Sequence, residues 1–129
     1  MLESNLTIAF HGLDHSNAVE ERIREEARKL DKIFDGIIGG AVRIELPHRH
    51  QGQNKRYEVH IQISMPGKGE IVVSHEPGKD EDHEDLNKTI NQAFNAARRQ
   101  LKERVEKMRG NVKNHDRRGK MPAAGSESV

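Results

Sequence analysis

The chain has 129 residues, with 22 Lys and Arg against 21 Asp and Glu, and 33% of its residues are hydrophobic. This length fits one domain of ordinary size, and one Tyr and three Phe make its core aliphatic and modest. The absence of cysteine excludes disulfides and thiolate metal sites. No apolar run is long enough to span a membrane and no signal core begins the chain, so we expect a cytoplasmic protein.

The near-zero net charge of +1 hides an uneven distribution. Residues 70–85 contain seven acids and one base, a net charge of −6. Residues 86–120 contain eleven bases and three acids, a net charge of +8. The overall charge therefore hides an acidic segment followed by a basic helix and tail.

The first two elements are a strand and a helix. Residues 6–10 alternate between apolar and small or polar side chains, which predicts a half-buried strand ending at His11 and Gly12. Apolar residues then recur every three or four positions from Val19 to Phe34, which predicts a helix over 17–34. Its N-terminal cap is expected from the Asp, Ser and Asn residues at positions 14, 16 and 17.

Three further strands follow. The Gly39-Gly40 pair predicts a break, and residues 42–46 alternate as a second strand. Residues 57–65 give the most regular alternation in the chain, and residues 71–73 predict a shorter fourth strand after a turn at 66–69.

A long amphipathic helix is predicted over residues 86–109. Its apolar stripe runs from Leu86 to Met108 at spacings of three and four, and such a stripe must be buried for the helix to be stable. The periodicity fails past Gly110, so we expect a domain over residues 1–110 and a flexible basic tail over 111–129.

This order of elements predicts an α+β fold, a two-layer sandwich of β-α-β-β-β-α topology. Each strand has one apolar face, so both helices should cover the same face of a four-stranded mixed sheet. The outer surfaces of the two helices would then lie side by side, and their basic side chains would face either a polyanion such as RNA or, as in an ordinary solvated helix, only water. The candidate RNA-binding residues are Arg22, Lys29, Lys32, Lys88, Arg98, Arg99, Lys102 and Arg104.

Two segments resemble one known family. They are ARKLDKIFD at residues 27–35 and HEDLNKTINQAFNAARRQL at residues 83–101. Together with the order of elements from Leu6 to Arg109, they are similar to the ribosome hibernation factors. This family includes the hibernation-promoting factors, the ribosome-associated inhibitor and the sigma-factor modulation proteins. The PHRH segment at residues 47–50 resembles a proteobacterial branch, and we expect a short form without the C-terminal dimerisation domain of long members.

The resemblance implies binding to the small ribosomal subunit, in the channel used by messenger and transfer RNA, and inhibition of translation in stationary phase or stress. Contacts in the family are mainly between basic side chains and ribosomal RNA phosphates. Lys29, Lys32 and Arg99 fall on basic positions of the family. The chain departs from close relatives at three positions, with Asn87 in place of Tyr and Ala96 and Glu103 in place of Lys.

Alternative functions rest on weaker patterns. The histidines His48 and His50, together with His75 or His83, could bind zinc or nickel. The simpler interpretation is that they are ordinary polar residues of loops and strands. The carboxylates over 80–85 are typical of a solvated stretch before a helix, and no nucleophile motif or phosphate loop is present, so we expect no enzyme and no cofactor. A regulatory module whose basic helix docks on an acidic protein remains a third possibility.

Overall fold

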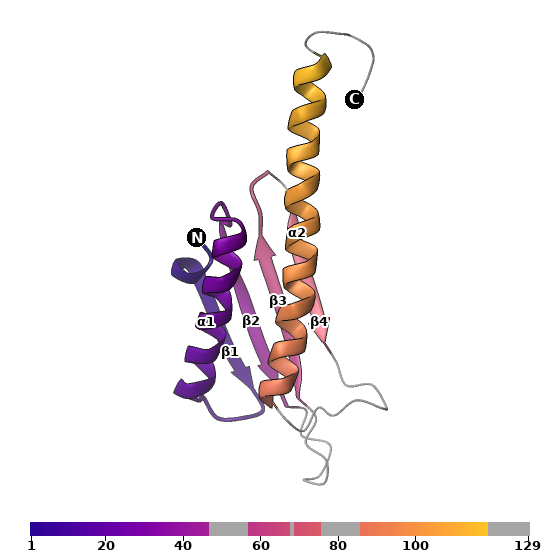
Figure 1. Ribbon diagram of the computed structural model, residues 1–129. Helices are drawn as coiled ribbons and strands as arrows, with labels where there is room; N and C mark the ends of the chain where they lie inside the picture. Colours follow the sequence, from indigo (N-terminus) through magenta and orange to yellow (C-terminus); the bar gives the residue numbers. More distant parts are fainter. Residues whose placement is uncertain (47–56, 68, 76–85, 119–129) are drawn as a thin grey trace.

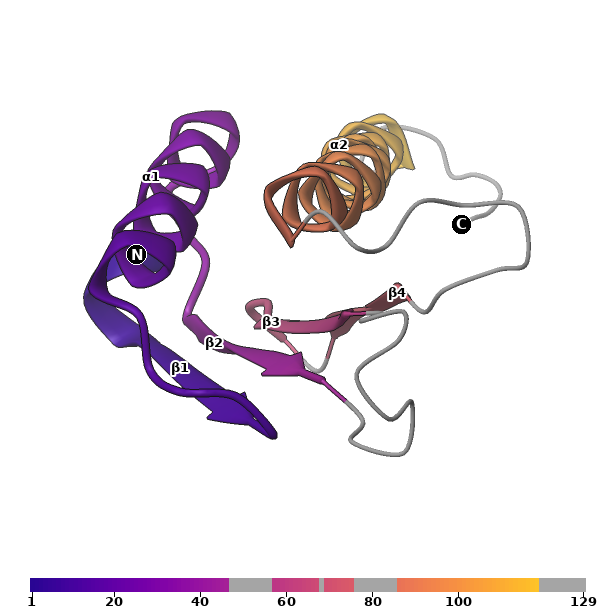
Figure 2. The same cartoon turned by 90° about the horizontal axis from the view of Figure 1, so that it is seen from below.

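The structure is a computed structural model that describes residues 1–46, 57–67, 69–75 and 86–118, the last eight as backbone only. A four-stranded sheet forms one layer, and two helices lie together over one of its faces (Figures 1 and 2). The elements follow the predicted order. They are the 3₁₀ turn η1 (Glu3–Asn5), β1 (Leu6–His11), α1 (Asn17–Ile33), β2 (Gly39–Glu45), β3 (Glu58–Ser64), β4 (Glu70–His75) and α2 (Leu86–Arg118).

The sheet is mixed, with strand order β1-β2-β3-β4. β1 and β2 are parallel, which the α1 crossover allows, and the remaining neighbours are antiparallel. In β3 the side chains alternate strictly between buried and half-buried, as the sequence predicts for a sheet with one covered face. The predicted α+β sandwich with both helices on one face is confirmed.

The core lies between the sheet and the two helices. α1 contributes its buried stripe, in which Ile23 and Ala27 are fully inaccessible, and α2 contributes Phe94 and Leu101 at 1% and 0% exposure. The aliphatic character of this core agrees with the composition. Ser16 is the N-terminal cap of α1, because its hydroxyl accepts a hydrogen bond from the Val19 amide at 3.2 Å.

The Gly39-Gly40 pair, predicted to interrupt regular structure before the second strand, lies within that strand, because β2 begins at Gly39. The reason is close backbone approach: a Cβ on Gly39 would lie 2.9 Å from the Asn5 carbonyl oxygen, and one on Gly40 would lie 2.5 Å from that of Gln62. The two glycines therefore allow the beginning of β2 to approach the neighbouring backbone closely. Local sequence does not distinguish this use of glycine from its use in a turn.

α2 continues past Gly110 to Arg118, so the helix is longer than the 86–109 predicted from its periodicity, and the backbone over 111–118 is helical. The apolar stripe ends at Met108, but backbone hydrogen bonding can continue beyond it, since extending an existing helix costs far less than starting one. Residues 119–129, the acidic stretch over 76–85 and the histidines His48, His50 and His83 lie outside the described residues. In the part of the chain that is described, no helix is long and apolar enough to cross a membrane.

Candidate nucleic-acid interface

The two helices meet at a seam built around one buried carboxylate. Glu26 of α1 is only 6% exposed, and three cationic side chains surround it. Its oxygens lie 3.2 Å from Lys29 Nζ, 3.7 Å from Arg98 Nη2 and 3.8 Å from Arg22 Nε. Since Arg98 belongs to α2, this carboxylate ties the two helices together.

A second contact crosses the seam. The Arg22 guanidinium donates a hydrogen bond to the Asn91 side-chain oxygen of α2. Arg98 also donates to the Asn95 oxygen, at 2.9 Å, which fixes its guanidinium from its own helix. We call Arg22, Glu26, Lys29, Asn91 and Arg98 the inter-helix seam, and its long cationic side chains are held in place by these contacts.

The charge of the seam remains positive. Three cations around one carboxylate leave a net charge of +2, because 3 − 1 = 2. A buried carboxylate needs cationic partners, whereas each of these cations is at least 28% exposed and keeps contact with water. Phosphate oxygens of an approaching polyanion can therefore reach these side chains.

Three further candidates, Lys32, Arg99 and Lys102, are exposed. Among the described side chains, no carboxylate lies within ion-pair distance of any of the three, so their charge is not offset by a direct partner. We call them the exposed trio. Lys88 is also exposed, in the first turn of α2.

Arg104 is set apart from the other candidates. Its Nη2 donates to the Glu70 carbonyl oxygen at 3.1 Å, which places this guanidinium against β4 and away from α1. The helical position explains this, since Arg104 is spaced by three and four residues from Leu101 and Met108 in the apolar stripe that faces the sheet.

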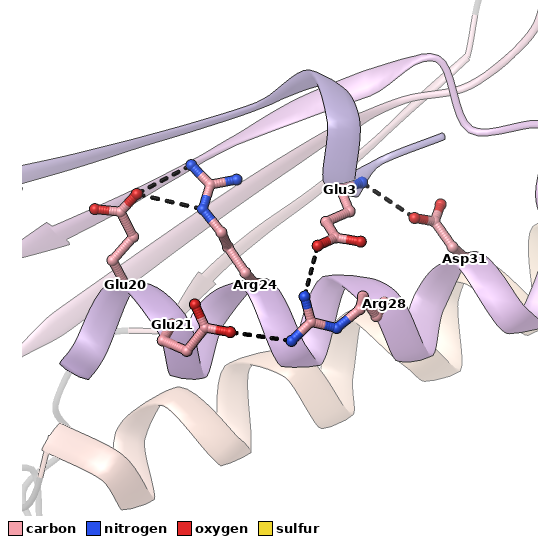
Figure 3. Close-up of polar contacts among 6 residues, drawn as sticks. All are labelled: Glu3, Glu20, Glu21, Arg24, Arg28 and Asp31. Carbon is pink, nitrogen blue, oxygen red and sulfur yellow. Dashed lines mark hydrogen bonds and ion pairs between the residues drawn. The ribbon is translucent and has the colours of Figure 1, made fainter. Parts of the chain in front are cut away.

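The opposite flank of α1 is basic in sequence but paired in the structure. Arg24 is held by Glu20 at 3.0 Å, and Arg28 bridges Glu3 at 2.5 Å and Glu21 at 3.2 Å (Figure 3). These hydrogen bonds raise the pKa of Arg28, and those from His15 and Arg24 lower the pKa of the Glu20 carboxyl. This flank therefore carries little unpaired positive charge.

The same flank fixes the start of the chain. Asp31, 6% exposed, accepts a hydrogen bond from the backbone amide of Leu2 at 2.7 Å. It accepts a second from the backbone amide of Glu3 at 3.0 Å (Figure 3). A carboxylate here satisfies the free amides at the N-terminus of η1. The acids and bases on this flank hold η1 against α1, which is a structural task.

Sequence reasoning missed Glu26 and Asn91. Glu26 lies four residues after Arg22 and three before Lys29, and it adjoins the stripe residues Ile23 and Ala27. An acid at the edge of an apolar stripe, with bases one turn before and after, is the signal that could have identified it.

Comparison with known proteins places the chain in one family. Two solved structures share the fold: the N-terminal domain of Protein Y from Thermus thermophilus (TM-score 0.60, 22% identity, 77% of this chain and 97% of that one), and a ribosomal subunit interface protein from Coxiella burnetii (TM-score 0.63, 17% identity, 79% and 98%). No curated protein matches the sequence. Residues 6–109 match the family described as Sigma 54 modulation protein / S30EA ribosomal protein, and this chain belongs to that family.

Proposed function

We propose that this protein binds the small ribosomal subunit through ribosomal RNA and inhibits translation as a hibernation factor. The family description names a ribosomal protein, and one structural neighbour is named a ribosomal subunit interface protein. Association with ribosomes would place the protein in the cytoplasm. The resemblance in the two segments at residues 27–35 and 83–101 adds the small subunit, its messenger and transfer RNA channel, and action in stationary phase or stress.

The main observation in support of ribosomal RNA binding is the cationic surface where α1 and α2 meet. The seam contributes a net charge of +2, and the exposed trio adds three cations that no described carboxylate pairs with. Lysine and arginine at fixed positions bind backbone phosphates and release their counterions. Such contacts position a protein on structured RNA and need no catalytic group.

The two faces of the molecule differ in charge, which supports the choice of the helical face. On the uncovered face of the sheet, the described cation Arg43 is paired with Glu45 at 2.7 Å, and Glu58 and Glu70 add further negative charge. A polyanion would be repelled there and attracted to the seam.

The three departures from close relatives lie on α2. Asn87 and Glu103 are exposed and Ala96 is half-buried, so each can be changed without opening the core. In our proposal Arg98 and Lys102 supply the charge that Ala96 and Glu103 do not. The role of Arg104, bound against β4, is then to hold α2 on the sheet and not to bind RNA.

Co-sedimentation with purified ribosomes and separated subunits tests the proposal. We expect retention on the small subunit that weakens with salt, and loss of retention when Lys29, Lys32, Arg99 and Lys102 are changed to Glu. Far-ultraviolet circular dichroism and thermal unfolding of that variant establish that it still folds.

Two outcomes would overturn the proposal. The first is unchanged retention of the folded charge-reversal variant. The second is a complex that survives complete digestion of ribosomal RNA by nuclease, which would identify the basic helices as a docking surface for an acidic protein instead.

A further inference from the structure

Two carboxylates lie directly opposite each other on the uncovered face of the sheet. Glu45 of β2 and Glu58 of β3 are paired in register, and their side chains are 28% and 21% exposed. Like charges at directly opposed positions destabilise a sheet unless a cation lies between them. The partly buried setting strengthens the repulsion, because the carboxylates are less screened than on an open surface.

His60 faces both carboxylates. Its Nε2 lies 3.4 Å from Glu58 Oε1 and 3.8 Å from Glu45 Oε1, and the three ligand atoms all lie within 4.8 Å of one another. Ligands at zinc distances of about 2.0–2.2 Å are separated by about 3.4 Å along the edge of a tetrahedron. The two shorter distances are close to this value, so an ion fits among the three atoms with small adjustments.

The outer contacts hold the ligands in the orientation a metal requires. His60 Nδ1 lies 3.1 Å from the Ser74 hydroxyl, so an Nδ1 proton donated to that oxygen leaves Nε2 free to bind the ion. Arg43 Nε holds the other oxygen of Glu45 at 2.7 Å. The three ligand side chains are 18–28% exposed, so water can reach the fourth position of an ion held among them.

We propose that Glu45, Glu58 and His60 form a zinc site with one position open to water. The two carboxylates balance the charge of the ion, and the imidazole and carboxylate donors suit zinc. The site differs from the one considered from the sequence, since His48, His50 and His83 are not among its residues and the His75 Nε2 lies 2.7 Å from the Gln92 side chain of α2. It lies on the opposite face of the sheet from the seam.

Isothermal titration of the tag-free full chain with zinc chloride tests this site. We expect one ion per chain, with binding at least tenfold weaker in Glu58→Gln and His60→Gln. Ser74→Ala should weaken binding by about 10- to 100-fold, the usual effect of losing an outer contact to a ligating histidine. Titration with Co²⁺, followed by visible absorption, should give a tetrahedral spectrum that His60→Gln abolishes.

The matched control is the double variant His48→Gln/His50→Gln, which should bind zinc as the wild type does. The proposal is overturned if the wild type shows no stoichiometric binding, if binding survives His60→Gln unchanged, or if binding is lost in the control. Ribosome co-sedimentation of His60→Gln should be unchanged, so failure of the zinc site and failure of the ribosome proposal can be told apart.

Discussion

The exposed trio allows a quantitative test of phosphate binding. Lys32, Arg99 and Lys102 are exposed, and no described carboxylate pairs with them, so each should neutralise one phosphate in the complex. Changing all three to Gln removes their charge and retains polar, though shorter, side chains. We expect weaker binding and, more specifically, a weaker dependence of binding on salt.

The magnitude follows from counterion release. Each phosphate contact contributes roughly 0.7–0.9 to the slope of log affinity against log salt, so three contacts contribute about 2.1–2.7. Between about 50 and 200 mM salt, a fourfold change, the wild type should therefore lose roughly 20- to 40-fold more affinity than the triple variant. Seam cations should contribute less per residue, since phosphates compete with Glu26 for them.

The assay is co-sedimentation or filter binding to small subunits at four or more salt concentrations. The control is Arg24→Gln/Arg28→Gln, which removes two positive charges from the paired flank of the same helix. Its slope should match that of the wild type, provided that thermal unfolding shows it to be folded. Equal slopes for the triple variant and the wild type would refute the reasoning, and so would a control slope reduced by the same amount per charge.

Four further results are expected. Glu25→Gln should strengthen small-subunit binding by roughly two- to fivefold, because it removes an exposed negative charge beside Lys29, and titration at fixed salt measures this. Asp31→Ala should lower the free energy of unfolding by about 2–4 kcal/mol in urea, since two amides lose a charged acceptor. Leu101→Ala, at a site with 0% exposure, should cost about 2–5 kcal/mol in the same assay. His15 and Arg24 lower the pKa of Glu20 from 4.5. The ionised Glu20 carboxylate therefore stabilises the folded state above pH 4.5, and this stabilisation is lost as the pH falls through the folded-state pKa. The Tm difference between wild type and Glu20→Gln should vanish in acid.

The sequence was sufficient for the layers of the fold because periodicity and burial share a physical cause. The alternation over residues 57–65 predicts β3 to within one residue at each end, and the stripe from Val19 predicts α1. The errors lie where backbone packing or helix propagation decides the outcome. Gly39 is required by contact with Asn5, a residue distant in sequence, and the end of α2 is independent of its apolar stripe.

The positions of bases on the two helices predict the candidate interface, and the contacts show which bases already have partners. Counting bases on α1 does not distinguish Arg24 and Arg28, which are paired with acids of η1 and of their own helix, from Lys32, which has no such partner among the described residues. The Glu3 contact depends on the path of the chain before β1, which no local pattern specifies. Arg104 could have been separated from the other candidates, since its spacing from Leu101 and Met108 places it in the stripe.

Glu26 shows why an acid can belong to a basic interface. Three cations lie within 4 Å of the Glu26 carboxylate. Without that carboxylate they would repel one another, and their side chains would spread into water. With Glu26 in place, the repulsion is offset and Arg98 is drawn towards α1, yet two of the three charges remain in excess. Glu26→Gln would raise the net positive charge and loosen the arrangement at once. Weaker small-subunit binding by this variant would therefore mean that the fixed positions of the cations matter more than their number, because charge alone predicts tighter binding.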